Sequence, residues 1–307
     1  MLTPMRDAIH DRIVNLIDTG QVKEAQDVLS SALKNSLKED SFLDGIIEPV
    51  QIGNNDLHPQ LDTETPVRIE QRLPDSPGAA AVPFLGGQMA LQLQTSRFAV
   101  YFYRIQTPAM WADVDKLRTH VYDIRQHYLD QGVKDIGETK DTRFIQACNT
   151  IVGTAGSTVT ATGVVQHANI SGGITRSSVM EALKTMNDTP NRLEPATCLV
   201  NVKFAKDILK WKPSDTSDNI SEAQLREGQK ALGDMFGYRW LMSIKRDIIP
   251  DNQMFMFAGP DYLGRHYVLQ EPVMWVKTEP TKVAFGAYTT LGFTIGNVAG
   301  VCKATFS

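Results

Sequence analysis

Residues 236–275 read FGYRWLMSIKRDIIPDNQMFMFAGPDYLGRHYVLQEPVMW, a stretch rich in aromatic residues and methionine. The turn sequence IPDN at 249–252 leads into a strand predicted for Met254 to Phe257, and Gly259-Pro260 ends that strand. Tyr262-Leu263-Gly264 then packs and turns before the next strand begins. The stretch predicts strands joined by compact turns and holds no set of residues suited to chemistry. We therefore interpret it as an assembly surface rather than an active site. Taken one by one, its aromatic and Met residues are more often core than interface residues: Phe236, Trp240, Met254, Phe255, Phe257, Tyr262 and Trp275.

The bulk composition is that of a folded globular protein. The chain has 307 residues, enough for a real core and two lobes, and 42% of them are hydrophobic and 21% charged. The net charge of −4 and the lack of a basic tail argue against a polycation that neutralises nucleic acid, because phosphate binding needs clustered Lys and Arg. Any contact with nucleic acid is therefore expected to be weak.

Cysteine use and hydropathy indicate where the chain folds. The widely spaced Cys148, Cys198 and Cys302 form no CxxC pair, so neither a disulfide framework nor a structural zinc site is expected. No stretch approaches the ~18 apolar residues of a membrane span, and the N-terminus lacks a signal sequence. We expect folding and assembly in a reducing cytoplasm.

The N-terminus predicts a short amphipathic helical hairpin. Thr3-Pro4 is a favourable helix start, Gly20 ends the first helix, and a second helix follows to Leu37. The apolar sides of the two helices include Ile9, Ile13, Leu29 and Leu33. Two interpretations stay open here: the hairpin belongs to the core of the chain, or it is an arm that packs on a neighbouring subunit.

A second hairpin is predicted after residues 45–65, which are poor in periodicity and read as an extended linker. Apolar and polar residues alternate over 67–73 and again over 89–94, which is the pattern of strands. The intervening residues 74–87 are too long for a tight turn and too rich in Ala, Gly and Pro for a helix. A two-stranded hairpin needs a surface to lie on, either the chain's own core or an adjacent subunit.

The middle of the chain predicts a covered strand, a long helix and a lobe boundary. Residues 96–105 are apolar or aromatic on both faces, which is typical of a covered strand. Helical spacing then runs from Val114 to Val152, with Gly132 and Gly137 suggesting a break. The Gly-, Ser- and Thr-rich segment 153–173 is the predicted boundary. Helix and strand then alternate without a regular βαβ period, so the class is α+β.

No catalytic, cofactor or metal site is predicted. His120, Asp123 and His127 share one helical face, but nothing supplies further metal ligands, and we interpret them as a solvated face. GxSxG, GxGxxG and P-loop patterns do not occur. The charged residues Arg239, Lys245, Arg246, Asp247, Arg265 and His266 lie among the aromatics of the opening stretch and suit the rim of a subunit interface.

The order of these features resembles the HK97-fold major capsid proteins of tailed double-stranded DNA bacteriophages. The resemblance covers residues 66–306 and uses the long-tipped hairpin, the long helix, the Thr175-Arg176 helix start, NVKFAKDILKW at 201–211 and the opening stretch. It implies an N-terminal arm and linker (1–65), an extended loop (66–107), a peripheral domain with a spine helix (108–165 and 268–307) and an axial domain (166–267).

By this resemblance the chain is a major capsid protein, not an enzyme, that builds an icosahedral virion shell from pentamers and hexamers around double-stranded DNA. Its expected partners are itself, a portal, and a scaffold or decoration protein. Expected inter-subunit contacts come from the arm, the extended loop and the opening stretch: Ile9, Ile13, Leu29, Leu33, Arg68, Glu70, Arg72, Phe84, Arg239, Arg246, Asp247 and Arg265.

Some relatives lock their shells by isopeptide bonds from a loop lysine, but no Lys occurs between Lys38 and Lys116. We therefore expect a non-covalent shell. We also expect that the N-terminal arm is not removed by proteolysis. The alternatives are an encapsulin-type nanocompartment that encloses an enzyme, a soluble α+β enzyme, and a tail or decoration protein.

Overall fold

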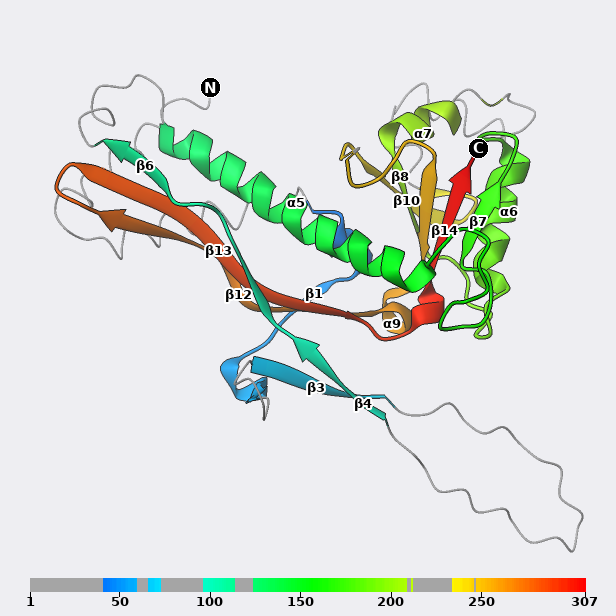
Figure 1. Ribbon diagram of the computed structural model, residues 1–307, viewed down its shortest axis with the longest axis horizontal. Helices are drawn as coiled ribbons and strands as arrows, with labels where there is room; N and C mark the ends of the chain where they lie inside the picture. Colours follow the sequence, from blue (N-terminus) through cyan, green and yellow to red (C-terminus); the bar gives the residue numbers. More distant parts are fainter. Residues whose placement is uncertain are drawn as a thin grey trace, which may run out of the picture.

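The computed structural model describes residues 41–59, 66–72, 96–113, 124–208, 211, 234–245 and 247–307. A long helix, α5 (Ile124–Val152), lies along two long paired strands, β12 (Gly264–Thr278) and β13 (Lys282–Ile295), and ends beside a second sheet (Figure 1). A separate strand pair projects from the side of the long strands. The α+β class predicted from the sequence is confirmed.

The six-stranded lobe contains a mixed sheet in the order β7-β14-β11-β8-β10-β9. Its β8–β10 and β14–β7 pairs are parallel, and the other pairs are antiparallel. Its strands are β7 (His167–Ile170), β8 (Thr197–Asn201), β9 (Asp234–Met235), β10 (Tyr238–Ser243), β11 (Gln253–Phe257) and β14 (Val301–Phe306).

Strand β11 shows why this sheet is apolar on both faces. Met254 and Met256 pack in a cluster with α6 (Arg176–Asn187) and α7 (Val202–Ile208), while Phe255 and Phe257 pack in the opposite cluster with α5. Because side chains alternate along a strand, a sheet covered on both faces needs apolar residues at successive positions. All four side chains are fully buried. Met254, Phe255 and Phe257 are therefore core residues, as expected for them individually, and the interpretation of the whole stretch as an assembly surface is wrong for this part.

The predicted start of α6 is confirmed. Thr175 is the N-cap, and its hydroxyl accepts a hydrogen bond from the Ser178 backbone N–H at 3.3 Å. The predicted end of β11 is also found, because Pro260 begins the short helix α9 (Pro260–Leu263) immediately before β12.

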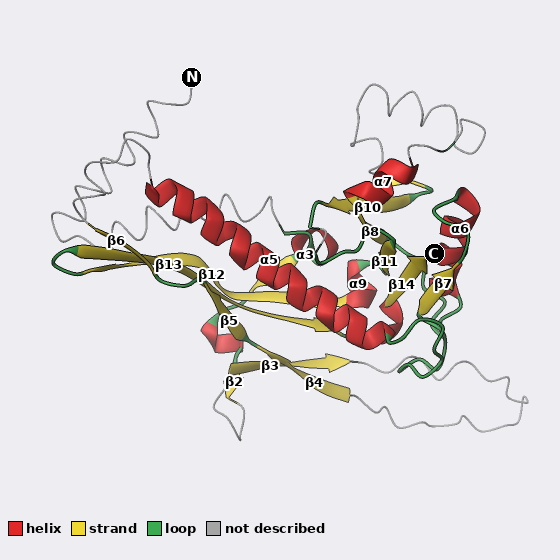
Figure 2. Ribbon diagram, turned by 45° about the horizontal axis from the view of Figure 1, so that its top comes forward, coloured by secondary structure: helices red, strands yellow, loops and turns green. Residues whose placement is uncertain are grey.

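The long-sheet lobe contains β1 (Pro49–Gln51), β12, β13 and β5 (Tyr103–Gln106), with β6 (Met110–Asp113) pairing with the start of β13. Strand β1 runs parallel to β12 and the other pairs are antiparallel. A 3-10 turn (Val298–Gly300) joins β13 to β14 and so connects the two sheets. Figure 2 shows α5 crossing above β12 and β13.

Helix α5 is continuous through Gly132 and Gly137, so the predicted break is wrong. Each glycine inside a helix costs roughly 1 kcal/mol relative to alanine. Packing offsets that cost, since Ile136, Phe144 and other apolar side chains of the helix are buried. Residues 114–123, where the helix was predicted to begin, lie outside the described residues.

The projecting pair consists of β3 (Pro66–Arg72) and β4 (Ser96–Tyr101), with the short β2 (His58–Pro59) on the other edge of β3. The register joins Val67 to Tyr101 and Arg72 to Ser96, so the described partner of residues 66–72 is 96–101. The predicted partner, residues 89–94, lies outside the described part. Strand 96–105 was predicted to be covered on both faces, which is wrong: Val100 is buried but Tyr101 is 54% exposed.

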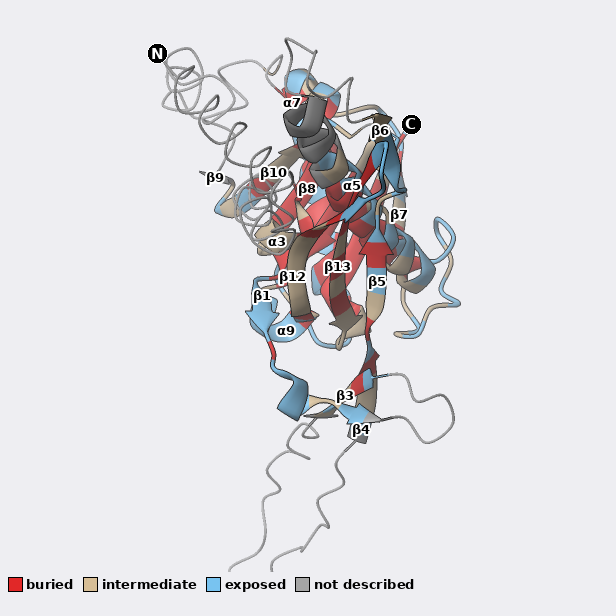
Figure 3. Cartoon of the chain, turned by 90° about the vertical axis from the view of Figure 1, so that its left-hand side faces the viewer, coloured by how far each residue is buried: buried red, intermediate tan, exposed pale blue. Residues whose placement is uncertain are grey.

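Residues 41–52, which we call the strap, dock against the body of the molecule, so the prediction of a plain linker from residue 45 is wrong for this part. The strap contains α3 (Leu43–Ile46) and β1, and a 3-10 turn (Asn54–Asp56) follows it. Leu43, Ile46 and Ile47 are at most 2% exposed. Figure 3 shows β1, coloured as exposed, beside β12.

The sheets divide at other residues than the sequence-based boundaries. β12 begins at Gly264 rather than at 268, and β14 belongs to the sheet that contains β8 and β11. The C-terminal half of α5 shares a core with both sheets, since Phe144 and Cys148 cluster with Phe255 and Phe293.

Candidate assembly surfaces

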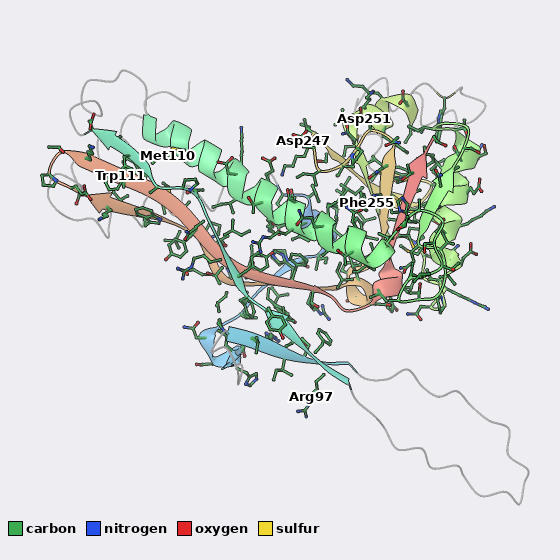
Figure 4. The ribbon with its side chains drawn as sticks, viewed as in Figure 1. Arg97, Met110, Trp111, Asp247, Asp251 and Phe255 are labelled. Carbon is green, nitrogen blue, oxygen red and sulfur yellow. The ribbon has the colours of Figure 1, made fainter. Side chains whose placement is uncertain are left out.

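The free end of the long-sheet lobe carries two exposed apolar residues on β6, which we call the tip pair. Met110 is 36% and Trp111 48% exposed, although neighbouring residues on a strand point to opposite faces. This strand pairs with β13 on one side, and one exposed side chain of the pair lies on each of its faces. Figure 4 shows the tip pair at the end of the lobe, far from the six-stranded sheet.

The tryptophan ring has a large apolar area, and covering it with a partner is favourable. Tryptophan is therefore enriched at protein interfaces. The Lys277 ammonium lies 5.8 Å from the Trp111 ring centroid, and Trp111 is still 48% exposed. The tip pair therefore suits contact with another protein surface.

The base of the projecting hairpin is fixed to β12 by a polar triad. Tyr267 Oη donates a hydrogen bond to Glu70 Oε1 at 2.5 Å, and Arg68 Nε lies 2.7 Å from the same oxygen. The Arg68 guanidinium also lies over the Tyr267 ring, 4.5 Å from its centroid. Burial and the neighbouring Glu70 carboxylate raise the pKa of Tyr267 to about 12, so the phenol stays a donor at neutral pH. The triad sets the direction in which the hairpin leaves the body.

A cleft of about 640 Å³ lies where the hairpin base meets the two lobes. The hairpin contributes Glu70 and Phe98, the six-stranded lobe Asn191 and Leu193, and the start of β12 contributes Arg265. Tyr262 on α9 lines the cleft and is 63% exposed. The cleft is polar, open and shared by three parts of the fold.

The strap is held by side chains from both lobes. The fully buried Asp141 on α5 accepts hydrogen bonds from Ser41 Oγ at 2.8 Å and Leu43 N at 3.2 Å, and Lys245 Nζ lies 2.7 Å from its other oxygen. Arg239 donates to the Gly45 carbonyl at 3.0 Å. Asp141 thereby satisfies backbone N–H groups at the start of α3.

Of the predicted contact residues, Arg68, Glu70 and Arg239 make the bonds within the chain described above. Asp247 and Arg265 are exposed, Asp247 on the turn between β10 and β11 (Figure 4). Arg72 lies in β3. Ile9, Ile13, Leu29, Leu33, Phe84 and Arg246 lie outside the described residues, as do His120 and Asp123.

Sequence reasoning did not select Met110, Trp111 or the strap. The available signal at the tip was the pair Met110-Trp111 two residues after Pro108 of the Thr107-Pro108 breaker, which places large apolar residues near a chain turn. The strap had a weaker signal, the apolar pairs Phe42-Leu43 and Ile46-Ile47 at helical spacing.

Reactive groups are few in the part of the chain that the structure describes. No three His, Cys, Asp or Glu side chains there lie close enough to hold a metal ion, and no described helix is both long and apolar enough to cross a bilayer. Cys148, Cys198 and Cys302 are free and buried. Burial raises the pKa of the Cys198 and Cys302 thiols to about 12, which keeps them protonated and unreactive.

No family model and no curated protein matches the sequence, but solved structures match its fold. The capsid of a native GTA particle aligns over 86% of this chain and 89% of its own, with TM-score 0.60 and 15% identity. A virus-like particle from Pyrococcus furiosus aligns over 92% and 99%, with TM-score 0.58 and 13% identity.

A structure from Microbacterium phage Oxtober96 aligns over 88% of this chain and 91% of its own, with TM-score 0.60 and 12% identity. The chain has the HK97 capsid fold. The resemblance seen in the sequence is confirmed for the HK97 fold. Sequence identities of 12–15% support a shared fold and nothing beyond it.

Proposed function

We propose that the chain is the major capsid protein of a tailed bacteriophage, which assembles through pentamers and hexamers into an icosahedral shell around double-stranded DNA. The observation that carries this proposal is the match to shell-forming proteins over nearly the whole of both chains. The exposed tip pair and the projecting hairpin support it, because each places apolar surface where one copy of the chain cannot cover it.

The contacts proposed for the shell come from three regions. They are the tip pair, the hairpin with Arg68, Glu70, Arg72 and Phe84, and the exposed residues of the six-stranded lobe and cleft, Asp247 and Arg265. The arm residues Ile9, Ile13, Leu29 and Leu33, with Arg239 and Arg246, remain proposals on sequence grounds.

The phage virion is favoured over a nanocompartment by the long segment that precedes the strap, which suits an arm that reaches a neighbouring subunit. Portal, scaffold and decoration proteins are the partners that this function requires. With a net charge of −4, the packaged DNA is held by enclosure and weak contacts rather than by a basic surface. Assembly takes place in the cytoplasm of the bacterial host.

The second candidate, an encapsulin-type nanocompartment, is favoured by the 99% coverage of the virus-like particle from Pyrococcus furiosus. The two functions differ in content. A shell isolated after nuclease treatment holds protected double-stranded DNA in the first case and a single protein species in the second.

Electron microscopy of the purified full-length protein tests the proposal. Closed shells of uniform diameter are expected, and a discrete monomer or small oligomer under all assembly conditions would overturn it. The absence of lysine between Lys38 and Lys116 predicts that boiled, reduced particles run as one band in a denaturing gel. A covalent ladder would contradict that expectation.

A further inference from the structure

The strap is attached to the body at one place beside a buried imidazole, that of His266. Asp44 on α3 is the strap's carboxylate at this place. Its Oδ1 lies 2.5 Å from Lys140 Nζ on α5 and 3.3 Å from His266 Nδ1 on β12. One carboxylate oxygen thus faces the Lys140 side-chain nitrogen and an imidazole.

His266 is fully buried, and its surroundings favour the neutral ring. Nδ1 lies near Asp44 without the alignment of a hydrogen bond, and Nε2 has no hydrogen-bond partner among the described residues. On the neighbouring strands, its register partners are Pro49 of β1 and Phe293 of β13, which cannot titrate. The charged groups that face it are therefore Asp44 and Lys140.

Protonation of His266 places a second positive charge in this buried site beside Lys140 and leaves Nε2–H without an acceptor. The Asp44 carboxylate opposes that cost by attraction. Burial outweighs it and lowers the pKa of His266 below its ordinary 6.5, with the Lys140 charge acting in the same direction.

We propose that His266, Asp44 and Lys140 form an acid-sensitive latch that holds the strap closed at neutral pH and lets it open when His266 takes up a proton. In the closed state the strap buries Leu43, Ile46 and Ile47 in the core that contains Cys148. Opening exposes these side chains and lets water solvate the imidazolium.

The direction of the pH effect on strap closure follows from the linkage between proton binding and closure. An imidazole with a lowered pKa in the closed state binds fewer protons there than in the open state. Closure is therefore strongest above pH 6.5 and weakens as the pH falls from 6.5 toward the lowered pKa. The opening equilibrium rises by up to about tenfold for each pH unit in that window. The inference concerns one copy of the chain and does not rest on the proposed shell function.

Hydrogen exchange of the full-length protein tests the latch at pH 7.5, 6.5 and 5.5, after correction for the intrinsic exchange rate. The amides of Gly45, Ile46, Ile47 and Ile52, bonded to Phe42, Leu43 and Val268 carbonyls, are expected to lose protection as the pH falls. The amides of β11 stay protected. His266→Gln should remove the pH dependence, whereas His58→Gln, a change of an exposed histidine on β2, should leave it as in the wild type.

A second readout uses the native cysteines and needs no variant. Labelling by 4,4′-dithiodipyridine, followed by peptide mapping, is expected to reach Cys148 at pH 5.5 while Cys198 and Cys302, which pack in the other core, remain protected. Equal strap protection and equal Cys148 labelling at pH 7.5 and 5.5 would overturn the latch. So would a pH dependence that survives in folded His266→Gln protein.

Discussion

The six-stranded lobe and the tip of the long-sheet lobe expose very different fractions of similar side chains. In β11 four successive apolar side chains are fully buried, whereas in β6 the neighbours Met110 and Trp111 are both substantially exposed. Both strands are short and apolar, and the difference is what covers them. One region stabilises the single chain, and the other leaves surface for a partner.

The space around glycine residues also differs between the sheet interior and α5. In the sheet interior Gly292 lets two backbones approach, while in α5 a Cβ added at Gly137 would have nothing within 4 Å. Substitutions in the two settings should therefore have opposite effects on stability.

Phe257→Ala should have the largest effect on the stability of the single chain. The ring is fully buried, with its centroid 5.4 Å from that of Phe144 and 6.4 Å from that of Phe255, and truncation leaves a cavity in the core between the sheet and α5. We expect a loss of about 3–5 kcal/mol in the free energy of unfolding, measured by urea denaturation. The matched control is Tyr262→Ala, five residues away and 63% exposed, which should stay within about 0.5 kcal/mol of the wild type. Equal losses would remove the distinction between core and surface in this stretch.

Gly292→Ala should have the next largest effect. An added Cβ would lie 2.7 Å from the Tyr101 carbonyl oxygen, a backbone atom at the end of β4, so β13 and the hairpin strand must move apart. We expect a loss of about 1–3 kcal/mol in unfolding free energy. Gly137→Ala, where nothing lies within 4 Å of the added Cβ, should instead stabilise α5 by about 0.5–1 kcal/mol. A neutral Gly292→Ala would mean that the hairpin base can shift freely.

Thr175→Ala should cost less, about 1 kcal/mol, because it removes the N-cap of α6. Thr150→Ala is the control, since that exposed hydroxyl bonds the Gln146 carbonyl one turn earlier in α5 and alanine has the higher helix propensity. In thermal unfolding, Thr175→Ala should lower the midpoint temperature. Thr150→Ala should raise it or leave it unchanged. A Thr175 variant as stable as the wild type would show that the Ser178 side chain caps the helix alone.

The sequence predicted correctly those helix starts, strands and strand ends that depend only on neighbouring residues. The N-cap at Thr175, the strand at Met254–Phe257 and its end before Pro260 follow from residue types within a few positions. The fold class followed from the order of elements. What failed depends on contacts made far along the chain: α5 stays continuous through Gly132 and Gly137 because Phe144 and its neighbours pack on two sheets.

The same reason explains the strap and the surfaces. Leu43 and Ile47 become core residues only because Asp141, Lys140 and Arg239, about 100 to 200 positions away, hold the strap. Apolar content alone likewise could not separate Phe257, which the sheet and α5 bury, from Trp111, which they leave exposed. Whether such a side chain is buried depends on which other helix or strand packs over it. Hydrophobic periodicity along the sequence does not identify that helix or strand.

Sedimentation velocity of the Met110→Ser, Trp111→Ser double variant tests the central claim most directly. The account predicts a folded species with an unchanged unfolding midpoint that forms no particles under conditions where the wild type assembles, whereas Val159→Ser, at a loop residue 91% exposed, still assembles. A double variant that sediments as particles like the wild type would contradict the assignment of the tip pair to assembly.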